Sequence, residues 1–232
     1  MNNNTTSCVK FSDQKICPYC KEPKAIKNGT TKNKKQQYHC KACNKRYISN
    51  YSYNAYRLNI NADIVLFTKE GLGIRSTARI LKIATTTLLK RIRAIAKQIS
   101  PPVIKKGKEY EVDEMCSYVR RKTNFIWLVY ALEKESKEVV SFNVGKRTNK
   151  TLRRVIDTLK LSDAKKIFTD GLKNYKYLIE SNVHAVKHHA TNHIERKNLT
   201  IRTHLKRFSR RTICFSRSDV MLDAILRIYF WA

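Results

Sequence analysis

The stretch YEVDEMCSYVRRKTNFIWLVYAL, residues 110–132, decides how the larger part of this chain folds. It holds two runs rich in β-branched and aromatic residues, 110–119 and 124–132, which favour strands. The polar residues 120–123 between them predict a turn, and a third strand is expected at 139–144 after a second polar turn. Because these connections are short, the three strands are predicted to form an antiparallel meander.

A helix and a fourth strand are predicted after this meander. Apolar residues recur at three- and four-residue intervals over 149–161, which is the pattern of an amphipathic helix. The short run 165–169 then predicts a strand. Three strands, a helix and a fourth strand are the opening order of an α/β fold of the ribonuclease-H-like, or retroviral-integrase-like, type. In such sheets the first and fourth strands are neighbours.

Three carboxylates are expected to meet on this framework. Asp113 lies in the first strand, Asp170 ends the fourth, and Glu195 lies near the start of a strongly basic helix. Carboxylates a few ångströms apart raise one another's pKa, and bound divalent cations usually offset this repulsion. Two magnesium ions bound by Asp113, Asp170 and Glu195 are therefore expected.

Glu111, Glu114 and Asp157 compete with the three acids for these roles. Alternation along the first strand places Glu111 on the same face as Asp113 and Glu114 on the opposite face, so the choice of Asp113 is not unique. For each of the three acids, a surface ion pair in a basic protein is the alternative.

The basic segment NHIERKNLTIRTHLKRFSRR, residues 192–211, contains one acid, Glu195. Keeping that acid as a metal ligand, with basic neighbours holding the phosphates, explains this pattern. Arg202 follows seven residues later, on roughly the same helix face. The further cations expected to contact DNA are Arg196, Lys197, Lys206, Arg207, Arg210 and Arg211.

The composition points to a polyanionic partner. The chain carries 48 Lys and Arg against 18 Asp and Glu, a formal charge of +30 on 232 residues, while 42% hydrophobic residues suffice for a real core. No apolar run approaches the roughly 18 residues of a membrane-spanning helix, and the polar start is unlike a signal peptide. A soluble cytoplasmic protein associated with the nucleoid, with no membrane partner, is expected.

Helices are predicted upstream of the strands. Residues 62–70, 76–81 and 85–99 show helical spacing, and a Gly-Leu-Gly turn separates the first two as in a helix-turn-helix. The third helix would lie in a DNA major groove; a small bundle with a solvated basic face is the alternative. The cations on its polar side are Lys90, Arg91, Arg93 and Lys97.

The N-terminal part carries a metal motif. Cys17 and Cys20 form one CxxC pair, Cys40 and Cys43 form another, and nineteen residues separate the two pairs. Two such knuckles make the tetrahedral four-sulfur cage of a structural zinc ribbon; redox dithiols or chance spacing are the alternative. The domains expected are a zinc ribbon at 1–58, a helix-turn-helix at 59–100, a linker at 101–108 and the catalytic domain at 109–232.

Several of these stretches resemble the insertion-sequence-one family of bacterial DDE transposases. The resemblance lies in 192–203 and its continuation at 212–218, in 112–115, and in 169–171, with twenty-four residues between Asp170 and Glu195. It also extends over the zinc ribbon and the helix-turn-helix. The resemblance implies Asp113, Asp170 and Glu195 as the catalytic triad, with Arg202 as the basic residue that follows the glutamate.

The function expected is therefore metal-dependent cleavage and strand transfer of double-stranded DNA at transposon terminal inverted repeats and at a target. One magnesium would activate water, and the second would stabilise the leaving oxygen when the freed 3′ hydroxyl attacks. A homo-oligomer, a dimer or larger, is expected because the two ends of the transposon must be handled together. The alternatives are a zinc-ribbon and helix-turn-helix regulator with an inert C-terminal domain, and a ribonuclease-H-like nuclease that cuts without joining.

Overall fold

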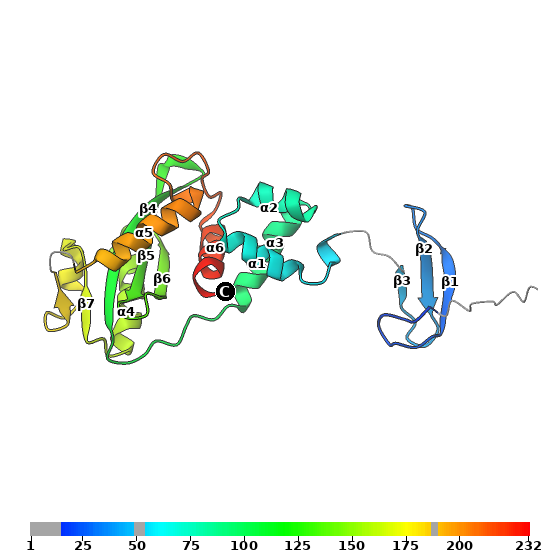
Figure 1. Ribbon diagram of the computed structural model, residues 1–232, viewed down its shortest axis with the longest axis horizontal. Coiled ribbons are helices and arrows are strands. Elements are labelled where there is room, and N and C mark those ends of the chain that lie inside the picture. Colours follow the sequence, from blue (N-terminus) through cyan, green and yellow to red (C-terminus); the bar gives the residue numbers. More distant parts are fainter. Residues whose placement is uncertain (1–14, 49–53, 187–189) are drawn as a thin grey trace, which may run out of the picture. The chain divides into compact units, whose positions relative to one another are not determined.

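The computed structural model describes residues 15–48, 54–186 and 190–232 (Figure 1). The chain divides into two compact units, Met1–Tyr56 and Arg57–Ala232. In the described residues, no helix is long and apolar enough to cross a membrane.

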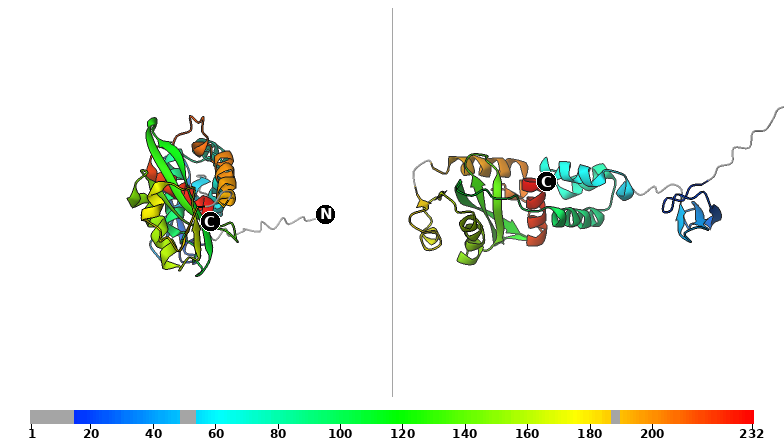
Figure 2. Two further views of the ribbon diagram at one scale, coloured as in Figure 1. Left: turned by 90° about the vertical axis from the view of Figure 1, so that its left-hand side faces the viewer. Right: turned by 90° about the horizontal axis from the view of Figure 1, so that it is seen from below.

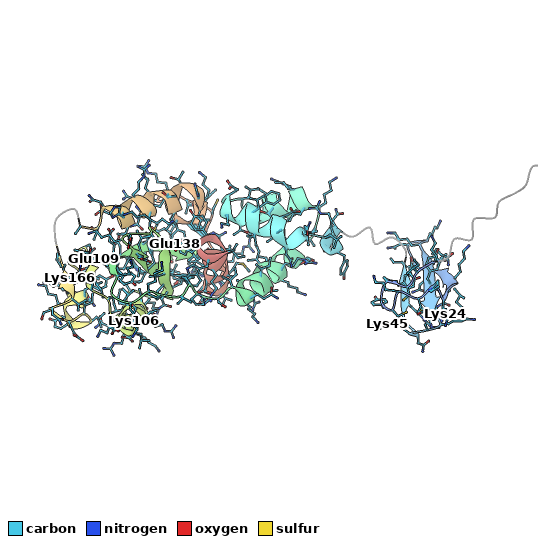
Figure 3. The ribbon with its side chains drawn as sticks, turned by 60° about the horizontal axis from the view of Figure 1, so that its bottom comes forward. Lys24, Lys45, Lys106, Glu109, Glu138 and Lys166 are labelled. Carbon is cyan, nitrogen blue, oxygen red and sulfur yellow. The ribbon has the colours of Figure 1, made fainter. Side chains whose placement is uncertain are left out.

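The first unit is a small antiparallel sheet built around cysteines. Its strands are β1 (Ala25–Thr30), β2 (Gln36–Cys40) and β3 (Arg46–Ile48), paired in the order β1-β2-β3. The buried side chains are Cys17, Tyr38, Cys40 and Tyr47. Lys24 and Lys45 are among the basic side chains drawn around this sheet in Figure 3. So few apolar groups are too little to stabilise a fold of this size without a further constraint.

The second unit is organised by a mixed five-stranded sheet. Its strands are β4 (Glu109–Val119), β5 (Arg121–Glu133), β6 (Val139–Gly145), β7 (Lys166–Phe168) and β8 (His184–Ala185), in the order β6-β5-β4-β7-β8. The β4–β5 and β5–β6 pairs are antiparallel, whereas β4–β7 and β7–β8 are parallel. The predicted meander and the predicted adjacency of the first and fourth strands are both confirmed.

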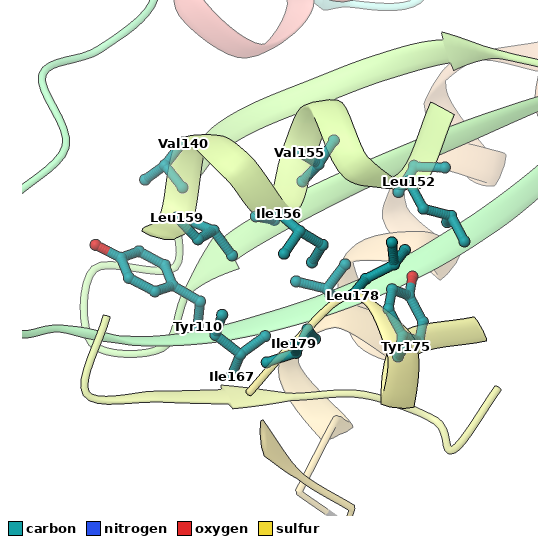
Figure 4. Packing of buried hydrophobic residues seen from close by; sticks show 13 residues of the cluster. Tyr110, Val140, Leu152, Val155, Ile156, Leu159, Ile167, Tyr175, Leu178 and Ile179 are labelled. Carbon is teal, nitrogen blue, oxygen red and sulfur yellow. The ribbon is translucent and has the colours of Figure 1, made fainter. Parts of the chain in front are cut away.

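Two helices cover opposite faces of this sheet, α4 (Asn149–Leu161) on one and α5 (Asn192–His204) on the other (Figure 2). The α4 face is an apolar core in which Val112, Val155 and Ile167 are at most 1% exposed. Figure 4 shows the packing of this core, with Val155 and Ile167 among the labelled side chains. Each such fully buried side chain contributes about 1.5–3 kcal/mol. Alternation along β4 therefore sends Val112 into this core and directs its neighbours Glu111 and Asp113 toward α5.

The remaining helices pack on one another and on the sheet. These are α1 (Ile60–Lys69), α2 (Ile74–Leu81), α3 (Thr85–Gln98) and α6 (Asp219–Trp231), with the short 3₁₀ helices η2 (Lys173–Tyr177) and η3 (Lys206–Phe208); the 3₁₀ helix η1 (Asn54–Tyr56) belongs to the first unit. α6 contacts α1, α3 and β6, and Trp231 Nε1 donates to the Val139 carbonyl at 2.7 Å. The helices expected as a separate DNA-binding domain thus share one compact unit with the sheet, while the four-domain division remains a prediction.

A glycine marks a close approach between these helices and α5. Gly71 lies in the turn after α1 with φ +73°, and a Cβ there would lie 2.1 Å from the carbonyl oxygen of His204. His204 is the last residue of α5. Glycine is therefore required both for the backbone angle and for the contact that sets α1 against the end of α5.

Element boundaries differ from the predictions by a few residues. The largest difference is at the β4–β5 turn, because β5 begins at Arg121 rather than at residue 124. The polar residues expected to form the turn instead extend the hairpin. The helices predicted at 62–70 and 76–81 begin two residues earlier, at Ile60 and Ile74, where Asn59 and Gly73 are the residues before the first turns.

Candidate active site and metal centres

Strand pairing brings two of the predicted acids together. Glu111 on β4 pairs with Phe168 on β7, and continuing this parallel register places Asp170 beside Asp113. Carboxylate oxygens of Asp113, Asp170 and a third acid, Glu114, all lie within 4.8 Å of one another. β7 ends at Phe168, so this edge of β4 is open where the three acids meet.

Glu114 belongs to this cluster although it lies on the opposite face of β4 from Asp113. Its side chain is 1% exposed, and its closest cation is Arg147, with Nη2 at 3.8 Å from Oε2. The guanidinium of Arg147 in turn lies 4.5 Å from the centre of the Trp127 ring. Oε1 of Glu114 is buried and has no hydrogen-bond partner among the described residues. A buried carboxylate oxygen without a partner is costly, and a bound cation would satisfy it.

The electrostatics of the cluster favour a cation. Burial raises the pKa of Asp113, and repulsion from Asp170 and Glu195 adds to the shift. Burial, followed by repulsion from Asp170, raises the pKa of Glu114 to about 7. Carboxylate oxygens are the ligands that magnesium prefers. The donor set therefore fits a hard divalent cation, and the acids can hold one.

Glu195 is close to the cluster but is not one of the three acids that meet. It is exposed in the first turn of α5, and Thr191 Oγ1 donates to its Oε1 at 3.2 Å. Its charge contributes to the raised pKa of Asp113, which places it within electrostatic reach. Two of the three predicted acids thus converge directly, while the third lies at the rim on α5.

Buried polar side chains fix α5 on the sheet. The carboxylate of Glu111, fully buried, contacts His193 Nδ1 at 2.6 Å through Oε1 and accepts from the Ile194 backbone N–H at 2.8 Å through Oε2. Asn198 Nδ2 donates to Asp113 Oδ2 at 2.6 Å, and the Tyr130 hydroxyl donates to Asn198 Oδ1 at 2.7 Å. These contacts hold Asp113 and the first turn of α5 in one arrangement. They also give Glu111 a defined role as the acceptor at the start of that helix.

Arg202 is half-buried two turns after Glu195, and its Nε has no hydrogen-bond partner in the described part of the chain. Its charge lowers the raised pKa values of Tyr130 and Cys116, so it faces the sheet near the site. Arg207 makes protein contacts, because its Nη1 donates to Ser216 Oγ at 2.9 Å. Among the other predicted cations of this region, Lys197 is half-buried, whereas Arg196, Lys206, Arg210 and Arg211 are exposed.

On α3, Lys90, Arg93 and Lys97 are exposed, as a DNA-facing surface requires. Arg91 is half-buried instead and donates from Nη1 to Asn61 Oδ1 at 2.8 Å, so it also links α3 to α1.

The four cysteines of the two CxxC pairs converge in the first unit. Their sulfur atoms all lie within 4.8 Å of one another, with Cys17 to Cys43 and Cys20 to Cys40 each at 3.6 Å. Although burial raises the pKa of Cys17, hydrogen bonds from the backbone of Cys20 and Tyr19 lower it to about 6, whereas the pKa of Cys20, which a backbone hydrogen bond from Glu22 lowers, is raised to about 12 by burial and by contacts with the other thiols. A thiolate is the form that binds zinc. The cluster therefore fits a four-sulfur zinc site, as the spacing predicts.

Sequence reasoning did not assign Glu114, Asn198 or Tyr130 to the site. Glu114 lies beside Asp113 in the run EVDEM, but strand alternation points it to the other face, and only the open edge next to Asp170 reunites them. Asn198 follows Glu195 by three residues, so it lies on a nearby face of α5. That spacing is the one signal that identifies it in advance.

The mixed sheet, with acids where its first and fourth strands meet and a basic helix across them, suggests a ribonuclease-H-like fold of the integrase type. The chain belongs to the IS1 transposase family, whose model matches residues 109–231.

Curated relatives agree with this assignment. "Insertion element IS1 4 protein InsB" of Escherichia coli (strain K12) is 35% identical over 119 residues, which is 51% of this chain and 71% of the relative. "Insertion element IS1 protein InsB" of Shigella sonnei is also 35% identical, over 51% of this chain and 91% of the relative. Among solved structures, a simian T-cell lymphotropic virus intasome in complex with PP2A regulatory subunit B56 gamma matches at a TM-score of 0.37 and 15% identity. It covers 70% of this chain and 66% of the other. That likeness is too weak to define the fold.

Proposed function

We propose that this protein binds the terminal inverted repeats of an insertion sequence and catalyses metal-dependent DNA strand cleavage and strand transfer. The observation that supports this most is the convergence of Asp113 and Asp170 at the open edge of β4, with Glu195 near them on α5. Family membership supports the same reaction class. Asp113, Asp170 and Glu195 are the proposed catalytic acids.

Bound magnesium would neutralise charge on the scissile phosphate and activate the attacking hydroxyl, and two ions are proposed. The acids hold the cations, and Asn198 keeps Asp113 oriented through the 2.6 Å hydrogen bond. Glu114 is buried and partly neutralised by Arg147, so it contributes negative charge from beneath the cluster. Arg202, half-buried on α5, supplies positive charge near the acids, which would favour the approach of a phosphate.

The other parts of the chain support DNA binding in this proposal. Zinc bound by Cys17, Cys20, Cys40 and Cys43 would hold the ribbon at 1–58. The helices at 59–100 would recognise the repeats through exposed cations of α3 and connect through 101–108 to the catalytic domain at 109–232. Terminal-repeat and target DNA are the partners, the protein acts in the cytoplasm, and a dimer or larger assembly handles two ends.

Strand transfer with the full chain tests the proposal. A labelled duplex carrying an end of the element that encodes this chain is incubated with a target plasmid and magnesium, and the joined product is measured. Asp170→Asn should abolish cleavage and joining, whereas Asp163→Asn, at an exposed acid outside the cluster, should leave both unchanged. Cleavage without joining by the wild type would favour a nuclease. Specific binding without cleavage would favour a regulator.

A further inference from the structure

The long β4–β5 hairpin ends in a basic tip that the acidic site does not use. Arg120, Arg121 and Lys122 are all exposed at this tip. The segment at 206–217, which follows α5, lies against the tip, because Val119 forms a bridge with Ser216 and the Arg120 N–H donates to the Ser216 carbonyl at 2.8 Å. Figure 1 shows the hairpin and this segment at the same end of the second unit.

Contacts at both ends of this segment fix it in place. Ser117 Oγ donates to the Arg207 carbonyl at 2.8 Å, and Arg207 Nη1 reaches Ser216 Oγ at 2.9 Å. The Tyr118 ring lies 5.7 Å from the Phe215 ring. The hairpin and the segment therefore present one set of exposed cations, called here the hairpin-tip surface: Arg120, Arg121, Lys122, Arg210, Arg211 and Arg217.

The charge of the hairpin-tip surface differs from that of the opposite end of the sheet. Neither 117–125 nor 205–217 contains an acid. The turn between β5 and β6 instead mixes acids and bases, with Lys108 Nζ at 2.5 Å from Glu135 Oε2. Figure 3 labels further acids and bases of this other end, among them Lys106, Glu109 and Lys166. Repulsion among cations at the tip is left uncompensated, which costs stability and favours a polyanionic partner.

The backbone at Arg120 permits a substitution that removes its charge without straining the turn. Its φ is +65°, in the left-handed region, where a residue with a Cβ costs roughly 1–3 kcal/mol relative to glycine. Its Nε donates to the Arg217 carbonyl at 3.2 Å, so the side chain lies along the neighbouring segment. Glycine would form this turn with less strain, so replacing Arg120 by glycine removes a cation without adding backbone strain.

We propose that the hairpin-tip surface binds the phosphate backbone of duplex DNA outside the active site. This rests on the proposed function for the identity of the polyanion as DNA. Arg120 directly follows β4 and lies seven residues after Asp113, a span of at most about 23 Å. At about 3.4 Å per base pair, the surface reaches phosphates up to about seven base pairs from the one at the acidic cluster.

Salt-dependent binding of the full chain to random-sequence duplex DNA tests the surface. The test variants are Arg120→Gly, which removes one cation while relieving backbone strain, and the pair Arg121→Gln with Lys122→Gln. The matched control is Lys137→Gly, because Lys137 also has a left-handed φ, +61°, but lies in the mixed-charge turn. Each lost phosphate contact should reduce the slope of log K against log salt by about 0.9. Arg120→Gly should lose one contact and the pair two, both with an unchanged or higher Tm.

The outcomes separate this inference from the proposed function. Slopes reduced in the tip variants but not in Lys137→Gly support the surface. If wild type binds duplex DNA and performs strand transfer while the tip variants keep the wild-type slope, the surface is wrong and the transposase function stands. If the wild-type chain binds no duplex DNA under any salt condition, both fail. An equal loss in Lys137→Gly would indicate general electrostatics and would also overturn the surface.

Discussion

The two candidate metal sites are built in opposite ways. In the ribbon, all four sulfur ligands lie within 27 residues of one another in sequence, in two CxxC pairs, and the sulfurs already lie within 4.8 Å. In the acidic cluster, Asp113 and Glu114 come from β4 and Asp170 follows the end of β7, while Glu195 lies nearby on α5. Local sequence assembles the first site, whereas the whole second unit assembles the other.

The energetic balance of the two sites also differs. The ribbon encloses few apolar side chains, so a bound metal would supply most of its stability. The acidic cluster lies beside a full apolar core that is stable without a metal. Repulsion between its carboxylates reduces the stability of the second unit. A metal that stabilises a fold and a metal that serves a reaction therefore call for different tests.

Removing zinc should have the largest effect, and only in the first unit. Cys40→Ser or a chelator should unfold residues 15–48, because metal binding contributes about 10–16 kcal/mol to sites of this kind. Metal analysis should find about one zinc per wild-type chain, and limited proteolysis should then cut the ribbon while the Tm of the second unit is unchanged. Cys116→Ser, at a half-buried thiol outside the cage, is the matched control. A folded ribbon without metal would contradict this prediction.

Glu195→Gln should separate catalysis from stability in the second unit. The substitution keeps the volume and removes one charge from an exposed position, so Tm and DNA binding should persist. Strand transfer should fall by roughly 10³-fold or more if Glu195 holds a catalytic cation. Glu180→Gln, at an exposed glutamate outside the cluster, is the control. Reduced Tm with activity retained would instead assign Glu195 to a structural ion pair.

Gly71→Ala tests whether the acidic site depends on long-range packing. The new Cβ would meet the His204 carbonyl and would also strain a positive φ. A loss of roughly 2–4 kcal/mol of stability is expected, combining the backbone cost with overpacking. Gly107→Ala, with φ +68° and open space around it, isolates the backbone cost. Thermal unfolding should show the larger loss for Gly71→Ala, together with reduced strand transfer and unchanged zinc content. Equal losses in the two variants would show that the close approach carries no energy.

Glu114→Gln should have the smallest effect and the opposite sign. Folding raises the pKa of Glu114 from 4.5 to about 7, so its contribution to stability is present below the lower value and is lost as pH rises through the higher one. At about pH 8, in a chelator, the variant should therefore melt higher than wild type. Added magnesium should reduce that difference, since it stabilises the wild-type cluster. A lower Tm in the chelator would show that the carboxylate makes a net favourable contact.

The parts that sequence predicts well are those with local signals. The CxxC pairs, the helical spacing of 149–161 and the strand runs from 110 to 144 all led to elements that the structure contains. The order of these elements also predicted that β4 and β7 are neighbours and that Asp113 lies near Asp170.

The parts that sequence did not predict depend on contacts between distant segments. The apolar face of α6 does not indicate which elements it packs against, so its contacts with α1, α3 and β6 were not foreseen. The roles of Glu111 and Asn198 depend on how α5 lies across β4, which periodicity cannot specify. The approach of Glu114 to Asp170 could have been predicted only by knowing that β7 ends at Phe168.

The position of α6 has a consequence for how the chain acquires its structure during translation. α3 is complete at Gln98, but α6, which covers it and α1, begins only at Asp219. At about 5–20 residues per second, roughly 6–24 s pass between the synthesis of the two. During that interval the nascent α1–α3 helices expose apolar surface that α6 later buries, and β6 lacks the same partner. The ribosome-bound chain therefore has a period in which chaperones can bind it, and in which its helices are not yet held against the sheet.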